Sequence, residues 1–373
     1  TYRAMAMIRE GSAHKARGDL DAAAKNWRAA QAVFEKLLKE GDDSEPVVYG
    51  LALVLYSQGF AALDGNGRGT PEQLKRAADL LRPLVYGAEP SLQTRKTYAD
   101  ILNVYSHMLP KEQGVTLCEE SRKVLVGLGA LDLSNLNAAS AYADATDSQS
   151  RHELFLGRLA DAQKHSQEVY DMAEKVLAQR PGDLRSLLNR YFAADMLGTL
   201  ANRRHDDAAA ADFTIQSVRA AEEYVRFNPS DMSAWEVWVR QLGILASLQF
   251  ERGDMAQSLS TARSTVALAQ DKRLPSSLNP MLTLTWNRIA RLERQLGHSA
   301  ASEQAMQMTA QSNTENIAQF PPNDPQREIF ALSETGLLGR IQLIDGQPRA
   351  ALASSSLVIK QLGQIKIPAN ERN

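Results

Sequence analysis

The fold is indicated most clearly by residues 232–270, which read MSAWEVWVRQLGILASLQFERGDMAQSLSTARSTVALAQ. Two amphipathic segments flank a short turn at residues 252–254, and this arrangement predicts two helices that pack against each other. Ala246 in the first helix and Ser258 in the second are small, so the two helices can cross closely. Gly253 in the turn supplies the left-handed backbone conformation that ends a helix. The stretch therefore predicts an antiparallel helix pair.

The same spacing of small residues recurs along the chain: seven positions from the first helix to the turn, then five to the second helix. Its six occurrences are Gly11, Gly18, Ala23; Ser150, Gly157, Ala162; Gly198, His205, Ala210; Ala246, Gly253, Ser258; Ala290, Gly297, Ser302; and Gly339, Gly346, Ala351. His205 stands where the other five have glycine in the turn. Prolines recur in register with this spacing, and proline is tolerated in the first turn of a helix but not in its interior. The pattern predicts repeated helix pairs.

The pattern resembles the tetratricopeptide repeat. That family has a small residue in its first helix, a glycine in the turn, an alanine in the second helix and a proline near the end. In the seventh repeat, Trp286, Ile289 and Ala290 are similar to the family's opening motif, and in the first repeat Trp27 and Ala30 occupy its large and small positions. The resemblance implies a scaffold that binds a protein or a peptide.

These observations predict an all-α fold, a right-handed superhelical solenoid of about eight antiparallel helix pairs in a single domain, residues 1–373. The repeats here exceed the family's ~34 residues, so we expect extended helices, for example over residues 159–179. The expected repeat boundaries are approximately 1–45, 46–89, 90–133, 134–181, 182–229, 230–279, 280–324 and 325–373.

Composition limits the function further. Hydrophobic residues make up 44% of the 373 residues and the formal net charge is −2, which gives no reason to expect nucleic acid as a partner. No apolar run approaches the ~20 residues that a membrane helix needs, so we expect no direct membrane insertion by this segment. Cys118 is the single cysteine, which excludes an internal disulfide.

A helical pattern is already present at Thr1, so we expect a fragment of a longer multidomain protein with an effector domain covalently attached upstream. The compartment stays open: periplasmic if a membrane helix lies upstream, otherwise cytoplasmic.

The search for catalytic motifs predicts no enzyme, no cofactor and no metal. His152 and Glu153 begin a zinc-helix motif, but no second histidine follows at the required spacing. The segment 64–71, DGNGRGTP, suggests either a phosphate loop or a calcium loop. It lacks the strand and the Gly-Lys-Ser/Thr of the first, and Lys75 stands where the second needs a bidentate glutamate. We interpret it as a flexible insertion that ends in a helix start at Thr70.

The inner surface of a solenoid is formed mainly by the first helix of each pair. The repeat register places seven candidate binding residues on that surface: Arg240, Ser247, Phe250, Asn287, Arg291, Arg294 and Arg340. Arginine offers a fork of donors suited to carboxylates, so these residues predict a site for an acidic partner. The alternative is a solvated helix face on which the arginines pair with Glu293 and Glu303.

Trp235 and Trp238 form the main aromatic cluster. We expect one in the core near Tyr224 and Phe227, whereas the other either shares that core or lines the inner surface with Phe250.

Two functions remain open. The first is an interaction module, typical of the C-terminal repeat region of a bacterial kinase or transcriptional regulator. The alternative is a domain that senses a ligand or a signal peptide and regulates an upstream effector.

Overall fold

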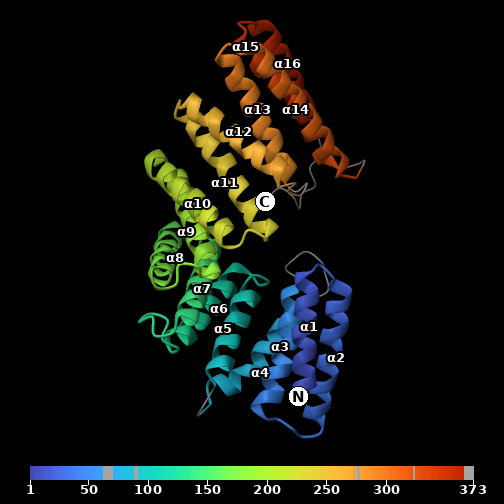
Figure 1. Cartoon of the computed structure of the whole chain (residues 1–373), viewed down its shortest axis with the longest axis vertical. Coiled ribbons are helices and arrows are strands. Elements are labelled where there is room, and N and C mark those ends of the chain that lie inside the picture. Colours follow the sequence, from blue (N-terminus) through green and yellow to red (C-terminus); the bar gives the residue numbers. More distant parts are fainter. Residues whose placement is uncertain (62–69, 88–90, 273, 275–277, 322–323, 365–373) are drawn as a thin grey trace. The chain divides into compact units, whose positions relative to one another are not determined.

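The structure is a computed structural model, and it describes residues 1–61, 70–87, 91–272, 274, 278–321 and 324–364. In these ranges the chain forms sixteen α-helices and no β-strand (Figure 1). The helices are α1 (Tyr2–Ala16), α2 (Leu20–Lys39), α3 (Glu45–Ala61), α4 (Pro71–Val85), α5 (Leu92–Ser106), α6 (Lys111–Val126), α7 (Leu136–Phe155), α8 (Leu159–Gln179), α9 (Leu184–Arg203), α10 (Asp207–Phe227), α11 (Met232–Glu251), α12 (Met255–Asp271), α13 (Asn279–Gln295), α14 (Ser299–Ala318), α15 (Pro325–Ile344) and α16 (Pro348–Leu362).

These helices confirm the predicted all-α fold, and each expected repeat contains two of them. The expectation of an extended helix over residues 159–179 is confirmed by α8, which has 21 residues. None of the described helices is both long and apolar enough to cross a membrane.

The chain divides into two compact units, which we call the N-terminal body (Thr1–Asp206, with α1 to α9) and the C-terminal body (Asp207–Asn373, with α10 to α16). Within each body, a helix contacts its neighbours in the chain, and the first helices of successive pairs also touch, as α5 touches α7 and α13 touches α15. The assignment of the whole chain to one domain stays a prediction.

The turns between paired helices have the left-handed backbone that the glycine spacing predicts. Gly253 has φ +83°, and no atom lies within 4 Å of the position that a Cβ would take. A side chain at this position would therefore be disfavoured by the backbone conformation and not by crowding. His205, the exception in the sequence pattern, also has a positive φ of 59°. The turn thus keeps its shape even where glycine is absent.

The small residues at the helix crossings have a second role that the spacing did not predict. Ser258 Oγ donates a hydrogen bond of 2.7 Å to the carbonyl oxygen of Ala246. Ser302 Oγ donates to the carbonyl of Ala290 in the same way, at 2.8 Å. In these pairs the serine of the second helix forms a hydrogen bond to the backbone of the first. The small residue at this position therefore contributes a hydrogen bond as well as allowing a close approach of the helices.

Several helices begin at side-chain caps, which satisfy backbone N–H groups that have no partner inside the helix. The carboxylate of Asp183, for example, accepts from the backbone N–H of Ser186 at 2.9 Å. At the start of α4, the Gln73 side chain accepts from the backbone N–H of Thr70, as the predicted capping box requires. The rest of the predicted insertion, residues 64–69, lies outside the described residues.

Candidate binding surfaces

The C-terminal body brings together three of the predicted residues. The guanidinium of Arg291 on α13 lies over the ring of Phe250 on α11, 4.7 Å from the ring centroid. Burial lowers the pKa of Arg291, and the positive charge of Arg340 on α15 lowers it further. Arg291 and Arg340 are thus close enough to repel each other. No ion pair joins either arginine to a carboxylate among the described residues.

Arg288, which the sequence analysis missed, belongs to the same surface. Its guanidinium donates to Ser247 Oγ at 2.5 Å and to the carbonyl oxygen of Gly243 at 3.4 Å. Burial is the main cause of its lowered pKa, and Arg291 adds to the effect while Glu251 opposes it. We call Ser247, Phe250, Arg288, Arg291 and Arg340 together the arginine surface.

Arg294 does not belong to the arginine surface in the way that the sequence predicted. Its Nε and Nη2 atoms donate to the two carboxylate oxygens of Asp345, both at 2.6 Å. The alternative pairing with Glu293 is not what the structure shows, because Glu293 is buried and bonds to Arg263 and to His298. The charge of Arg294 is therefore already compensated within the body.

The two other candidates lie nearby in sequence but make no such contacts. Arg240 is exposed on α11, and no hydrogen bond or ion pair joins it to the described residues. Asn287 on α13 is partly buried, and its amide has no hydrogen-bond partner among the described residues. Both remain available to a ligand, but the structure does not join them to the arginine surface.

Both tryptophans face α10. Their ring centroids are 5.6 Å apart, and they line a hollow of about 420 Å³ with α10 side chains. Trp235 Nε1 donates to the carbonyl of Pro229 at 3.0 Å, and Lys272 Nζ lies 4.5 Å from its ring centroid. Phe250 instead packs beneath Arg291, so neither tryptophan accompanies it. Both tryptophans are only partly buried, so the expected core position near Tyr224 and Phe227 is wrong, although the packing against the fifth repeat is present.

The N-terminal body contains a groove that the sequence analysis did not find. It has a volume of about 500 Å³ and lies against α3, α5, α7 and α9, the first helices of their pairs. We call it the N-terminal groove, and its lining includes Phe60, Asn103, Asp144, Asp147, Arg185 and Phe192. Arg185 pairs with two carboxylates, Asp144 and Asp100. Burial raises the pKa of Asp144 to about 6, although Arg185 acts in the opposite direction.

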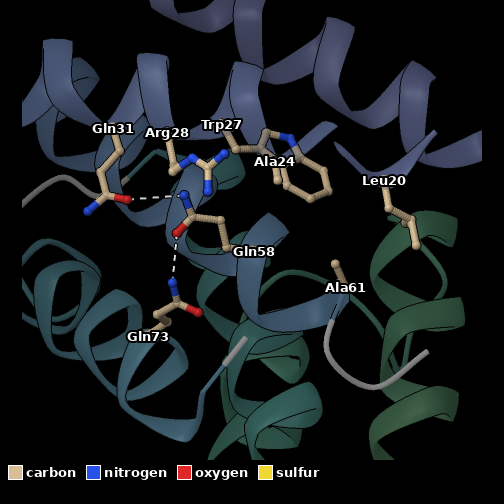
Figure 2. A pocket seen from close by; sticks show the side chains of 8 residues that line it. All are labelled: Leu20, Ala24, Trp27, Arg28, Gln31, Gln58, Ala61 and Gln73. Atoms are coloured by element: carbon tan, nitrogen blue, oxygen red, sulfur yellow. Dashed lines mark hydrogen bonds between the residues drawn. The ribbon is translucent and has the colours of Figure 1, made fainter. Parts of the chain in front are cut away.

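A smaller pocket of about 250 Å³ lies among α2, α3 and α4 of the same body. Figure 2 shows Gln58 between Gln31 and Gln73, joined to each by a hydrogen bond. The carbonyl of Gln73 accepts in turn from the backbone N–H of Thr70, and Gln31 donates to Glu35. Because these amides satisfy one another, the polar wall of this pocket leaves no amide oxygen in need of a ligand.

Comparison with known proteins supports the fold. No protein-family model and no curated protein matches the sequence. The chain is similar in structure to aspartyl phosphate phosphatase F from Bacillus subtilis, at 13% identity and a TM-score of 0.52, over 99% of this chain and 97% of that chain. A more distant similarity is to human IFIT1, at 14% identity and a TM-score of 0.42, over 95% of this chain and 72% of that chain. Another is to a tetratricopeptide repeat protein from Parabacteroides merdae, at 12% identity and a TM-score of 0.36, over 84% of this chain and 94% of that chain. Together with the repeat spacing, the helix pairs and the left-handed turns, the first of these similarities shows that the chain has a helical-repeat fold of the tetratricopeptide type.

Proposed function

We propose that this chain is a scaffold that binds a protein or a peptide, and that the arginine surface of the C-terminal body recognises an acidic segment of that partner. The observation that carries the proposal is the position of Arg291 and Arg340, which repel each other and form no ion pair with a carboxylate in the described residues. Two cations held together without an anion favour an anionic ligand, because the ligand would relieve their repulsion.

The chemistry of the surface fits a carboxylate better than another anion of the same charge. An arginine presents parallel N–H donors that match the two oxygens of a carboxylate, and the buried Nε of Arg291 has no hydrogen-bond partner among the described residues. The ring of Phe250 holds the Arg291 guanidinium in place and adds an apolar contact. We therefore expect the partner to present several glutamates or aspartates, or a free carboxyl terminus, next to an apolar side chain.

The test is a titration with an acetylated peptide of five glutamates that ends in a free carboxylate, compared with the same peptide made of glutamines. We expect the glutamate peptide to bind at least roughly tenfold more tightly, since charge complementarity decides the difference. The Arg291→Glu, Arg340→Glu double variant should lose this preference. Binding should weaken as salt is raised, because exposed charges are screened over about 10 Å at 0.1 M ionic strength.

The matched control is Arg349→Glu with Lys360→Glu, which changes the net charge equally at two exposed residues of α16, a helix that carries neither the arginine surface nor the tryptophan hollow. This control should bind like the wild type.

A pull-down from the source cell with both double variants extends the test to the natural partner. If the two double variants retain the same partners and the same peptide affinity, recognition lies elsewhere, and the tryptophan hollow is the next surface to test.

The finer proposal is that the scaffold serves a bacterial signalling or regulatory protein, with an effector domain attached upstream, and that it acts by binding rather than catalysis. The resemblance in fold to a bacterial aspartyl phosphate phosphatase is consistent with that setting. The coding sequence upstream of Thr1 provides the test, and a kinase or DNA-binding domain there would support the proposal. Hydrolysis of a protein aspartyl phosphate by the purified chain would contradict the proposal that it is not an enzyme.

A further inference from the structure

The N-terminal groove has a charge pattern opposite to that of the arginine surface. Asp144 on α7 bonds to Arg185 of α9, but it shares that arginine with Asp100 on α5, which also pairs with Lys96 at 2.7 Å. Asp147, one turn further along α7, pairs with Arg151 at 2.7 Å. Among the described residues, each cation that contacts these carboxylates is thus already in an ion pair, and Asp144 shares its arginine with Asp100.

Two oxygen atoms at the groove accept no hydrogen bond from any residue that the structure describes. Arg151 bonds to one carboxylate oxygen of Asp147, and the other, Oδ1, has no partner. Asp147 is only 8% exposed, so water does not readily replace the missing donor. Asn103 Oδ1, on the neighbouring helix α5, is also buried and without a partner. Both atoms can only accept hydrogen bonds, and a ligand that satisfies them must therefore supply N–H or O–H donors.

The aromatic lining of the groove attracts cations, and two of its rings already contact cations of the chain itself. Lys15 Nζ lies 4.1 Å from the centroid of the Phe60 ring, and the Arg151 guanidinium lies 4.8 Å from that of Phe192. A positive charge is attracted to the face of an aromatic ring. Tyr56 is next to Phe60, with ring centroids 6.0 Å apart, and it provides another ring at the same wall.

The geometry points to the N-terminal groove as a binding site for an organic cation with several N–H donors, namely an alkylguanidinium or alkylammonium group. Such a group would donate to the oxygens of Asp147 and Asn103, provide Asp144 with a second counter-charge, and pack against the aromatic wall. The groove volume of about 500 Å³ falls within the ~300–1,000 Å³ of sites for small ligands. The source of the group is either an arginine or lysine side chain of a peptide or a free polyamine.

Other ligands fit the groove less well. An anion would meet Asp144 and Asp147, while Arg185 is already held by two carboxylates. A metal ion would need a cluster of ligating side chains, and no group of three histidine, cysteine or acidic residues suited to a metal occurs in the part of the chain that the structure describes. This inference is independent of the acidic ligand proposed for the arginine surface.

The experiment compares matched probes on the whole chain by calorimetry. The probes are an uncharged-ended pentapeptide with a central arginine, the same peptide with citrulline, and spermidine. Citrulline keeps the shape of arginine but is neutral, so we expect the arginine peptide to bind at least roughly tenfold more tightly. Tight binding of spermidine with no binding of the arginine peptide would assign the site to a free amine. Equal affinity for arginine and citrulline, or no binding of any cationic probe, would overturn the proposal.

Variants locate the binding. Asp147→Asn keeps the size of the side chain but removes its charge, and we expect it to weaken binding of the preferred cation at least roughly tenfold. The matched control is Asp161→Asn, an exposed carboxylate on α8 of the same body, which should bind like the wild type. If Asp147→Asn does not fold, protection of α5 and α7 from hydrogen exchange by the cation in the wild-type chain replaces it. A response shared by both variants, or protection confined to other helices, would contradict the assignment.

Discussion

The two bodies use the first helices of their pairs for opposite electrostatics. In the N-terminal body, the first helices of the pairs present Asp100, Asp144 and Asp147 to the groove. In the C-terminal body, α13 and α15 present Arg291 and Arg340. The chain as a whole has a formal net charge of only −2, so its net charge indicates neither the acidic nor the basic surface. A helical-repeat fold fixes where a side chain points, and the residue at that position decides what it binds.

The bodies also differ in how they are held together. The N-terminal body has one large core cluster that includes Phe34, Leu51 and Ile101, whereas the clusters of the C-terminal body are smaller. The N-terminal body also contains a partly buried polar network, in which Arg122 bonds to Tyr142 and Glu168. We therefore expect the N-terminal body to respond more strongly to changes in packing and in pH.

The largest effect is expected for Phe34→Ala in the N-terminal core. Phe34 is fully buried, and its ring fills the space beside Gly50, where a Cβ would lie only 2.3 Å away. Removal of a buried phenylalanine costs about 3–5 kcal/mol of unfolding free energy. Because repeats contact mainly their neighbours, the loss should be confined to the N-terminal body, with acidic-peptide binding by the C-terminal body retained.

The measurement is hydrogen exchange resolved by peptide, with chemical denaturation of the whole chain. Phe155→Ala is the control, because Phe155 is 75% exposed and lies in the same body; changes at such surface sites usually stay within about 0.5 kcal/mol. Equal loss of protection in both bodies after Phe34→Ala would show that the two bodies unfold as one unit.

A smaller effect is expected from acid, again in the N-terminal body. Burial lowers the pKa of His152 to about 4, and His107, 5.4 Å away between ring centroids, contributes to the shift. In the unfolded state the histidine takes up a proton near pH 6.5. Between about pH 4 and pH 6.5, the unfolded state therefore binds more protons than the folded state. The stability that depends on neutral His152 is therefore complete above pH 6.5 and is lost as the pH falls toward 4.

Between pH 7.5 and pH 5, this one group should reduce the unfolding free energy of the N-terminal body by about 2 kcal/mol. The His152→Gln variant should flatten that part of the pH dependence, as measured by denaturant unfolding at each pH. The C-terminal body provides the internal comparison, because its single histidine, His298, has a side chain that is 60% exposed. An unchanged pH profile in His152→Gln would mean that other groups cause the acid sensitivity.

Those features of the fold that depend on neighbours in sequence could be predicted. The spacing of Ala246, Gly253 and Ser258 predicted a turn and a crossing because both are decided within about twelve residues. The proximity of Arg291 and Arg340 also followed from the repeat register, since the same position recurs in each first helix. The hydrogen bond at each serine crossing was not predicted, because the spacing only demands a small residue.

The missed contacts join side chains one repeat apart. Arg185 and Asp144 are separated by 41 residues, as are Arg288 and Ser247, and Arg294 and Asp345 by 51. Projection of each helix alone gives the direction of a side chain but not the charge that it meets on the next helix. A comparison of opposite charges and polar residues at intervals of about one repeat would have found the N-terminal groove and the partner of Arg294.

The smallest effect is expected for Asp345→Asn. This variant tests whether an ion pair with a carboxylate of the next repeat decides which arginines bind the acidic ligand. In the wild type, Asp345 holds Arg294 through two hydrogen bonds, so that Arg294 adds little to an acidic ligand's affinity. Removal of the carboxylate charge frees the guanidinium of Arg294 and takes a negative charge away from the same part of the body. We therefore expect the glutamate peptide to bind more tightly, by less than about tenfold because partly exposed ion pairs contribute little.

The double variant Asp345→Asn, Arg294→Gln is the control, and it should return the affinity to the wild-type value or below it. The two bodies supply a further comparison, because the arginine pentapeptide expected to bind the N-terminal groove should not respond to either change. The measurement is the salt dependence of glutamate-peptide binding, in which Asp345→Asn should steepen the slope. An Asp345→Asn variant that binds the glutamate peptide no more tightly than the wild type would show that Arg294 lies beyond the reach of the ligand, and would confine the site to Arg288, Arg291 and Arg340.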